Sequence, residues 1–340
     1  MSNTARKLDE NHFSFLPVNP TSHRHVRIQK YCPLCASDNT IPVMSERTKL
    51  PEDHAPELKH FNRVWSHLLE CKDCTFAFTE EIPVSPTFFK NRYDNRHFDP
   101  EYEVKSNRKH FILNEIFSML KKNGHSNGEL LDVGSFAGKL LKYSHDNGFT
   151  PTGIEVNPKL AQYSKEILGF DVICGEVQST QLPKEKFDVI TIIDVLEHLV
   201  EPKIVLQNLI YALKPGGVIV IKVPHYNMQK FKQKVANALG INSAGIFGGY
   251  GHINHFNTHS MIRVLKELGL ELHDCYNARS EHWENEGFIK KFKNKFRDFY
   301  WRFSNTFMKT LGLNIGMNTM YLAKKPSNKS EHLQKATSGQ

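Results

Sequence analysis

Four cysteines in the first quarter of the chain have the spacing of a metal site. They are Cys32 and Cys35 in YCPLC, and Cys71 and Cys74 in ECKDC, which together read C-x2-C-x35-C-x2-C. Four thiolates suit a tetrahedral structural Zn²⁺ and leave no open position for catalysis. We therefore predict a zinc-binding ribbon over residues 28–85. Its central gap is longer than usual, which predicts an inserted loop between the two pairs.

A second chemical signal lies in LLDVGSFAGKLL, residues 130–141, where an acidic residue ends a strand and glycines lead into a helix. The first glycine lets the backbone pass close to a ligand. The start of the helix supplies N–H groups that have no partner within the helix. In an open parallel sheet such a turn lies at the carboxyl edge of the strands, where ligands bind.

Three further acidic residues follow at the ends of later expected strands. Glu155 ends the second strand, at a distance from Asp132 that suits a carboxylate accepting both hydroxyls of a ribose. Glu176, in CGEV, ends the third strand, where it is placed to face an adenine amine. Asp194 ends the fourth strand and runs into VLEHLVEP, and LKPGG precedes the fifth.

The elements that position these residues follow from the hydrophobic pattern after residue 128. Short Val- and Ile-rich runs alternate with amphipathic stretches, which predicts a doubly wound, mostly parallel sheet of the α/β class. The expected strands are 129–134, 151–156, 170–175, 187–194 and 218–223, and the expected helices between them are 137–148, 158–169 and 201–217. A further helix and strand follow in 258–277, and a last strand begins at 318.

These motifs in this order resemble the class I S-adenosylmethionine (SAM) dependent methyltransferases, a Rossmann-like family. The resemblance rests on D-x-G-x-x-x-G from Asp132, E-H-L-x-x-P from Glu197 and L-K-P-G-G from Leu213. Phe136 departs from it, because the commonest pattern has a glycine there. A dehydrogenase fits less well, since G-x-G-x-x-G is absent.

The resemblance implies which residues hold the cofactor. Asp132, Gly134 and Gly138 would surround its methionyl part, with Ser135 beside them, and Glu155 would hold the ribose next to Val156. Glu176 and Val177 would border the adenine, and Asp194 with Val195 would close the pocket. The alternative is that these glycines and acids merely terminate strands.

Methylation of an oxygen or carbon requires a general base, for which histidine is the first choice near neutral pH. Three histidines lie where the resemblance places the mouth of the site: His225, His252 and His255. Sugar C-methyltransferases carry Y-H-E-H-L-S-Y-F-S in this region, and His252 matches its second histidine. We predict His252 as the base, although Gly251 replaces the preceding glutamate. The alternative is a loop or cap role for His252 and His255, and we expect His198 to be structural.

A four-cysteine ribbon before a SAM domain is also seen in enzymes of glycan and natural-product pathways. We therefore expect a SAM-dependent methyltransferase that acts on a sugar or glycan intermediate, free or lipid-linked. One alternative is an rRNA or tRNA methyltransferase, which the net charge of +8 favours. Against this alternative, the chain lacks the Asn/Asp-Pro-Pro-aromatic motif for exocyclic base nitrogens, because DVLE stands after the fourth strand. The other alternative is a non-catalytic SAM-fold binding protein.

A basic, aromatic helix is expected over 284–311. Phenylalanines at helical spacing form one face, with lysines and arginines between them. This face would pack on the domain, cover the acceptor as a lid, or contact an anionic membrane. The chain contains no run of about 18 apolar residues and its start has no apolar signal-peptide core, so we expect a cytoplasmic protein, with peripheral contact to the inner face of a membrane as an option. Oligomeric state stays open.

These expectations divide the chain into five parts. They are a flexible arm (1–27), the ribbon (28–85), a helical connector (86–122), the SAM-dependent methyltransferase domain (123–324) and a disordered tail (325–340). Within the methyltransferase domain, residues 225–250 and 284–311 are expected to be inserted or lid helices.

Overall fold

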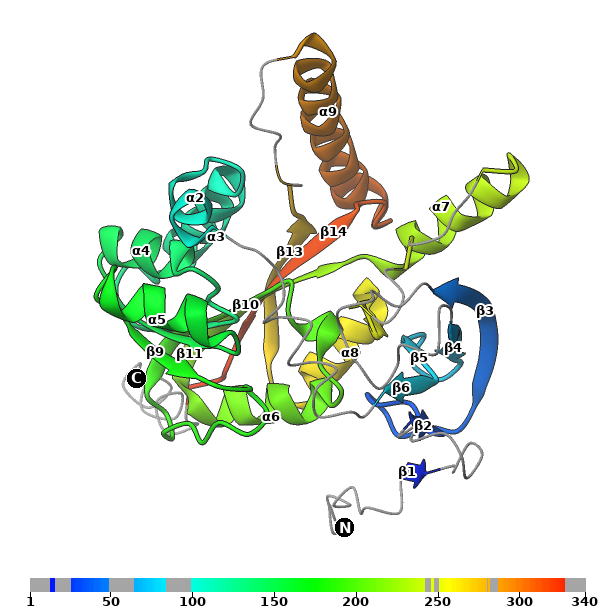
Figure 1. The fold of residues 1–340 in the computed structure, drawn as a ribbon, viewed down its shortest axis with the longest axis horizontal. Coiled ribbons are helices and arrows are strands. Elements are labelled where there is room, and N and C mark those ends of the chain that lie inside the picture. The colour runs from blue at the N-terminus through cyan, green and yellow to red at the C-terminus, as the bar shows by residue number, and fades with distance from the viewer. Residues whose placement is uncertain are drawn as a thin grey trace, which may run out of the picture.

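A seven-stranded sheet forms the centre of the protein in the computed structural model, which describes residues 13–15, 26–48, 64–83, 99–241, 246–247, 251–279, 281 and 287–327. The strand order is β13-β14-β11-β10-β7-β8-β9 (Figure 1). The five parallel strands are β7 (Gly128–Val133), β8 (Phe149–Glu155), β9 (Asp171–Cys174), β10 (Phe187–Ile193) and β11 (Leu213–Pro224). The strands β14 (Asn318–Lys324) and β13 (Glu271–Asn277) add in antiparallel fashion at one edge. The predicted Rossmann-like, mostly parallel sheet is confirmed.

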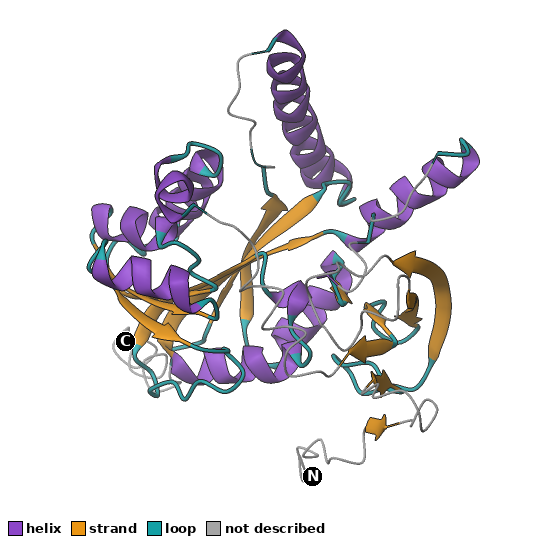
Figure 2. Ribbon diagram, viewed as in Figure 1, coloured by secondary structure: helices purple, strands orange, loops and turns teal. Residues whose placement is uncertain are grey.

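Strand alternation gives this sheet two buried faces. In β10, Ile190 and Ile192 point to the face that packs on α6 (Pro202–Ala212) and α8 (Thr258–Glu267). Val189 points to the other face, which packs on α3 (His110–Lys122) and α4 (Lys139–Asp146). Helices therefore cover both faces, as Figure 2 shows, and continuous Val/Ile runs are what such strands require.

Local capping sets the start of the helices nearest the ligand edge. Asn157 caps α5 (Pro158–Glu166) by accepting from the backbone N–H groups of Lys159 and Leu160, and Pro158 occupies the first helical position. Asn257 caps α8 through a reciprocal capping box with Ser260. The chain therefore turns sharply at these two residues.

The N-terminal region forms two small antiparallel sheets. One contains β1 (Phe13–Phe15), β2 (Val26–Gln29) and β6 (Glu81–Pro83). The other contains β3 (Thr40–Thr48), β4 (Val64–Cys71), β5 (Ala77–Thr79) and β12 (Asn254–His255). Because β12 comes from the second half of the chain, the ribbon and the methyltransferase domain share a sheet.

The ribbon also shares a hydrophobic core with the methyltransferase domain. The rings of Phe76 and Phe256 meet edge to face, with centroids 4.8 Å apart. Cys32 and Cys71 belong to the same buried cluster as Val264 of α8. The ribbon therefore packs against the α6–α8 side of the central sheet as an integral part of the fold.

Several expected segments contain more regular structure than the sequence indicated. The interval 1–27, expected as a flexible arm, contains β1 and the start of β2. The gap between the cysteine pairs, expected as a loop, contains β3 and most of β4, and residues 49–63 lie outside the described residues. The expected connector contains α2 (Pro100–Lys105) and α3. Most of the expected tail, from residue 328, also lies outside the described residues.

Two inserted helices project from the body of the molecule (Figure 1). They are α7 (Tyr226–Ala238) and α9 (Phe288–Leu311). The Trp301 indole donates to the carbonyl of Asn277 at 2.8 Å, and Ser304 is buried, so these residues hold α9 on the domain. Four members of the phenylalanine face lie elsewhere on the helix and are exposed, so these four do not pack on the domain: Phe292, Phe296, Phe299 and Phe303. Among the described residues, no helix has the length and apolar character needed to cross a bilayer.

Candidate functional site

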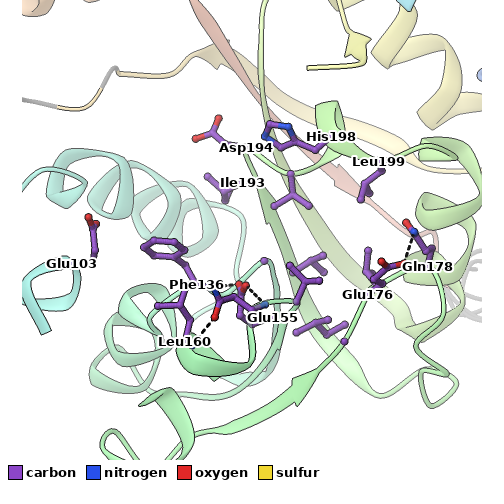
Figure 3. A pocket seen from close by; sticks show the side chains of 18 of the residues that line it. Glu103, Phe136, Glu155, Leu160, Glu176, Gln178, Ile193, Asp194, His198 and Leu199 are labelled. Atoms are coloured by element: carbon purple, nitrogen blue, oxygen red, sulfur yellow. Dashed lines mark hydrogen bonds between the residues drawn. The ribbon is translucent and has the colours of Figure 1, made fainter. Parts of the chain in front are cut away.

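A cavity of about 430 Å³ lies at the carboxyl ends of the parallel strands. Figure 3 shows Phe136 and Glu155 on one side of it, Glu176 and Gln178 on the other, and Asp194 at its rim. Seven of the ten expected cofactor residues line it: Gly134, Glu155, Val156, Glu176, Val177, Asp194 and Val195. The volume falls within the range typical of small-molecule sites, about 300–1,000 Å³.

The turn after β7 leaves no room for a larger residue at its first glycine. Gly134 has φ +75°, and a Cβ there would lie 2.5 Å from the Val195 side chain. Phe136 adopts φ +53°, so the turn is kept although phenylalanine replaces the usual glycine. Its ring lines the cavity (Figure 3). This departure therefore adds an aromatic wall without opening the turn.

Glu155 ties the second strand to this turn. Its carboxylate accepts from the backbone N–H groups of Phe136 and Asn157, each at 2.8 Å. Burial raises the pKa of Glu155, and these hydrogen bonds oppose that effect. A carboxylate offers about four lone-pair positions, so Glu155 keeps accepting capacity for a ligand hydroxyl.

The other three expected cofactor residues belong to the strand end and the turn but do not line the cavity. Asp132 is buried and accepts from the Thr191 hydroxyl at 2.7 Å, and burial raises its pKa to about 7. Ser135 is buried beside Gly153, and Gly138, with φ +85°, begins α4. Their contacts fix the conformation of the turn, and the turn positions the residues that line the cavity.

Asp194, at the end of β10, forms an ion pair with a buried lysine. Lys222 of β11 approaches the two carboxylate oxygens at 2.5 and 2.6 Å, and its side chain is only 5% exposed. Burial acts to raise the pKa of Asp194, but the charges of Lys222 and Lys109 outweigh it and lower the pKa. Asp194 also has φ +56°. A charged carboxylate in such a backbone conformation is typical of a functional position.

One wall of the cavity comes from the expected connector, which our sequence analysis did not connect with the site. Glu103, Arg108 and Lys109, from the α2–α3 segment, all line the cavity. Arg108 pairs with Glu281 at 2.7 Å. No local sequence motif predicts that these residues line the cavity, because their position depends on the long-range pairing of Arg108 with Glu281.

His198 and His252 stand at the boundary between this cavity and a second one. Their ring centroids are 4.8 Å apart. His198 lines the cofactor cavity, and His252 lines a groove of about 1270 Å³ that runs between α7 and α9. The expectation that His198 is only structural therefore missed its place on the cavity wall. These two imidazoles also lie with Glu197, and the three donor atoms are within 4.8 Å of one another, a spacing that would admit a cation.

The backbone on both sides of His252 is held by the segment that carries His198. The Nδ1 of His198 donates to the carbonyl of Gly251, and the N–H of Ile253 donates to the carbonyl of Glu197 at 3.0 Å. A carbonyl can only accept, so Nδ1 of His198 carries a proton. The ribbon adds a third bond, from the N–H of Thr79 to the carbonyl of Ile253 at 2.9 Å. His252 is therefore braced by η3 (Leu196–His198) and by the ribbon.

His225 and His255, the other two expected bases, are buried and line neither the cavity nor the groove. Burial lowers the pKa of His225 to about 4 and that of His255 to about 3. The His255 ring packs against Phe247, with centroids 5.3 Å apart. Both are neutral at pH 7 and are placed as packing residues.

The two cysteine pairs form matching turns. In the first, the N–H of Ala36 donates to the carbonyl of Cys32 at 2.8 Å, and Ala36 has φ +58°. In the second, the N–H of Thr75 donates to the carbonyl of Cys71 at 2.8 Å, and Thr75 has φ +60°. Two separate segments thus adopt one knuckle conformation.

The four sulfur atoms lie within 4.8 Å of one another, with Cys32–Cys74 and Cys35–Cys71 at 3.5 Å. A tetrahedral zinc with Zn–S bonds of about 2.3 Å would need sulfur–sulfur edges of about 3.8 Å. Hydrogen bonding to Cys35 and Cys74, together with burial, raises the pKa of Cys32. The donor set and its spacing fit a structural metal.

Comparison with known proteins identifies the family. The family described as "Methyltransferase domain" matches residues 104–274, half of the chain. The mitochondrial ubiquinone biosynthesis O-methyltransferase of Schizosaccharomyces pombe is 24% identical over 184 residues, which cover 51% of this chain and 66% of that protein. Its counterpart in Colwellia psychrerythraea is 24% identical over 197 residues, covering 55% of this chain and 78% of that protein. The chain thus spans about two thirds to three quarters of these relatives.

Two solved structures are similar in fold. One belongs to the complex between the Haloferax volcanii Trm112 methyltransferase activator and a putative methyltransferase, with a TM-score of 0.47, 12% identity, and 67% of this chain and 94% of that chain covered. The other is an S-adenosylmethionine dependent methyltransferase from Mesorhizobium loti, with a TM-score of 0.45, 12% identity, and 65% and 99% covered. The family match spans the glycine turn, the acidic strand ends and the histidine segment described above, and the chain belongs to the methyltransferase-domain family as a SAM-dependent enzyme of class I fold.

Proposed function

We propose that this enzyme methylates a hydroxyl oxygen of a lipid-linked acceptor, with His252 as the general base. The observation that carries the proposal is the meeting of the cofactor cavity and the α7–α9 groove at His198 and His252. One cavity suits SAM and the other suits an acceptor. The two imidazoles lie where the transferred methyl group and the acceptor would meet.

Four of the lining residues have the chemistry to hold SAM in the first cavity. Glu155 would accept from the ribose hydroxyls, and Glu176 and Gln178, joined by a 2.7 Å hydrogen bond, would border the adenine. Asp194 would face the cationic methionyl end, where the lowered pKa keeps it negatively charged. When bound, SAM supplies an electrophilic methyl group on a positively charged sulfur.

The protein must then orient the acceptor and remove its proton. SAM bound in the first cavity would supply the methyl group to the acceptor oxygen and leave as the neutral thioether, and His252 would accept the hydroxyl proton. The contacts of Gly251 and Ile253 with η3 hold His252 in place for this step. His198 acts as a positioning residue through its bond to Gly251.

The size and lining of the groove favour an acceptor with a long apolar tail. Its volume of about 1270 Å³ exceeds the range of about 300–1,000 Å³ for small-molecule sites. Met228, Phe296, Tyr300 and Trp301 line it. The relatives are named O-methyltransferases of ubiquinone biosynthesis, which supports oxygen as the methylated atom. A lipid-linked sugar is the acceptor that joins this groove to the glycan-type sequence pattern.

We infer further that Zn²⁺ bound by Cys32, Cys35, Cys71 and Cys74 is structural. None of the four sulfurs lines the cavity or the groove. One link from the ribbon to the site is the Thr79–Ile253 hydrogen bond. The metal would therefore act through the ribbon, by holding the backbone beside His252.

The test is methyl transfer from labelled SAM to matched acceptors. Each head group, a sugar hydroxyl or an aromatic-ring hydroxyl, is offered once with a polyprenyl tail and once without it. We expect transfer to the tailed sugar and much less transfer to its tail-less form. Equal transfer to both forms would reject the lipid-linked acceptor, and transfer only to the aromatic ring would reject the sugar.

A further inference from the structure

The helices α7 and α9 expose apolar side chains on both sides of the groove. On α9 these are Phe292 (65% exposed), Phe296 (59%), Phe299 (65%) and Phe303 (49%). On α7 and directly after it they are Phe231 (59%), Val235 (40%), Leu239 (67%) and Ile241 (57%). Single exposed apolar residues are ordinary, but a large group of them marks a binding surface. We call this group the α7–α9 surface.

The same two helices carry a strong positive charge. Their exposed cations are Lys232 and Lys234 on α7, and Lys291, Lys293, Lys295, Arg302 and Lys309 on α9. The two helices together contain one acidic residue, Asp298, which lies 3.3 Å from Arg279. The surface therefore combines aromatic side chains with cations that have little acidic compensation.

The sheet brings the bases of the two helices together. Pro224, at the end of β11, pairs with Asn318, at the start of β14. Helix α7 follows Pro224 closely, and α9 ends a few residues before Asn318. Both helices consequently project away from the central sheet in Figure 1, with α9 beside β13 and β14.

We propose that the α7–α9 surface binds an anionic lipid bilayer. The phenylalanines would enter the boundary between headgroups and acyl chains, and the lysines would contact lipid phosphates. Because α9 is amphipathic along 24 residues, it suits lying on the bilayer. The inference rests on the proposed function in one respect: the groove would then open onto the bilayer that holds the lipid-linked acceptor.

Two other occupants fit the surface less well. A second copy of the chain would place the cations of α9 against the same cations of its partner, at a cost in repulsion. A nucleic acid would be attracted by the charge, but Val235, Leu239 and Ile241 offer it neither hydrogen bonds nor stacking. An anionic bilayer offers an apolar environment to the apolar side chains and negative charge to the lysines and arginines.

The experiment is co-sedimentation of the full chain with vesicles, in the absence of SAM and acceptor. One set of vesicles is phosphatidylcholine alone, and the other also contains phosphatidylglycerol. We expect binding to the anionic vesicles, weaker binding to the neutral ones, and release by salt. The double variant Phe296→Glu/Phe299→Glu and the triple variant Lys291→Gln/Lys293→Gln/Lys295→Gln should each bind about tenfold less tightly or weaker.

A matched control uses an exposed pair on another helix. Ile167→Glu/Lys165→Gln alters an exposed isoleucine (66%) and an exposed lysine at the end of α5. This variant should bind like wild type. In a separate reporter, Phe299→Trp should shift its fluorescence emission to the blue when anionic vesicles are added, because the indole leaves water.

Several outcomes would overturn the inference. The wild-type protein could stay in the supernatant, or the surface and control variants could bind vesicles equally. The chain could instead form a dimer that Phe296→Glu dissociates, or RNA could displace the vesicles at equal charge. A separate assay of methyl transfer to a detergent-dispersed acceptor distinguishes failure of the bilayer-binding inference from failure of the proposed function. Transfer without vesicle binding rejects the docking surface alone, and vesicle binding without transfer rejects the proposed acceptor alone.

Discussion

The cofactor cavity and the α7–α9 groove meet at two histidines, yet they are constructed differently. The cavity is formed mainly by turns at the ends of neighbouring parallel strands, each set by a few consecutive residues such as the turn at Gly134. The groove lies between two inserted helices, and its inner end depends on η3, β12 and the ribbon. The strand ends would thus hold the cofactor, while the helices inserted into the fold would, under the proposed function, select the acceptor. This difference predicts that variants on the two sides separate SAM binding from methyl transfer.

The strongest challenge to that separation is removal of one of the four cysteines proposed to bind zinc. Cys71→Ser should release zinc and lower the free energy of unfolding by about 3 kcal/mol or more, because Cys71 is completely buried in the shared core. Methyl transfer should fall more than SAM affinity, since the ribbon bonds to Ile253. Metal content, thermal unfolding and calorimetry with SAM measure the three effects.

Cys174→Ser provides the control for that variant, because Cys174 is an exposed thiol on β9. It should leave metal content and unfolding unchanged. If Cys71→Ser lowered SAM affinity as much as methyl transfer, the ribbon would support both sides of the site equally.

Removal of the proposed base tests the groove side directly. His252→Ala should lower the turnover rate by about 10²–10⁴-fold and leave SAM affinity unchanged. His259→Ala, on the exposed side of α8, is the matched control. His198→Ala should lower the rate less and shift its pH profile, because it acts by positioning. Wild-type turnover in His252→Ala would reject the base assignment.

The buried histidines of the groove side should affect stability rather than catalysis. The pKa of His225 is lowered by burial to about 4, against an ordinary value of 6.5. As pH falls below about 6.5, the unfolded chain takes up the proton first, so stability is lost through this window towards pH 4. The loss should approach about 3 kcal/mol.

Urea unfolding at several pH values measures this effect. The variant His225→Asn should show a flatter pH dependence between pH 6.5 and 4, and His259→Asn should behave like wild type. A large loss of turnover in His225→Asn with unchanged stability would instead place His225 in the chemistry.

The smallest effect is expected from a single methyl group on the cofactor side. Gly134→Ala places a Cβ 2.5 Å from Val195, at a position with φ +75°. Gly169→Ala has the same backbone strain, with φ +76°, but nothing within 4 Å of the added Cβ. Gly169→Ala should lose about 1–2 kcal/mol of stability from backbone strain alone. Gly134→Ala should lose more because of its contact with Val195, and only this variant should weaken SAM binding, by roughly tenfold. Calorimetry with SAM compares them, and equal affinities would remove Gly134 from the cofactor wall.

Much of the fold could be predicted from the sequence because it depends on short-range patterns. Short apolar runs marked the parallel strands, with Val and Ile on successive positions in β10 and β11, and Pro158 marked the start of α5. The ligand edge was predicted in the same way, since Gly134, Glu155 and Asp194 end their strands and line the cavity. Asp132, Ser135 and Gly138 belong to the same motif but do not line the cavity, because Asp132 bonds to Thr191 and Ser135 is buried beside Gly153.

The parts of the fold and the site that could not be predicted from the sequence depended on contacts between distant segments. Arg108 reaches the cavity wall through its pairing with Glu281, and no local pattern in the connector indicates this. The phenylalanine stripe of α9 predicted one apolar face, but Trp301 and Ser304, on another side of the helix, make the contacts with the domain. Helical periodicity identifies a face and leaves open what that face packs against.

The cysteine pairs and the strand ends were determined by the sequence itself, since a knuckle or a turn needs only the backbone conformation of a few residues. Ala36 and Thr75 adopt the same left-handed conformation in two unrelated segments for this reason. Only the tertiary structure decided that β12 completes the ribbon sheet, and that His252 stands beside His198. These pairings join residues far apart in the chain, and side-chain packing of the whole molecule selects among the many alternatives that the local sequence permits.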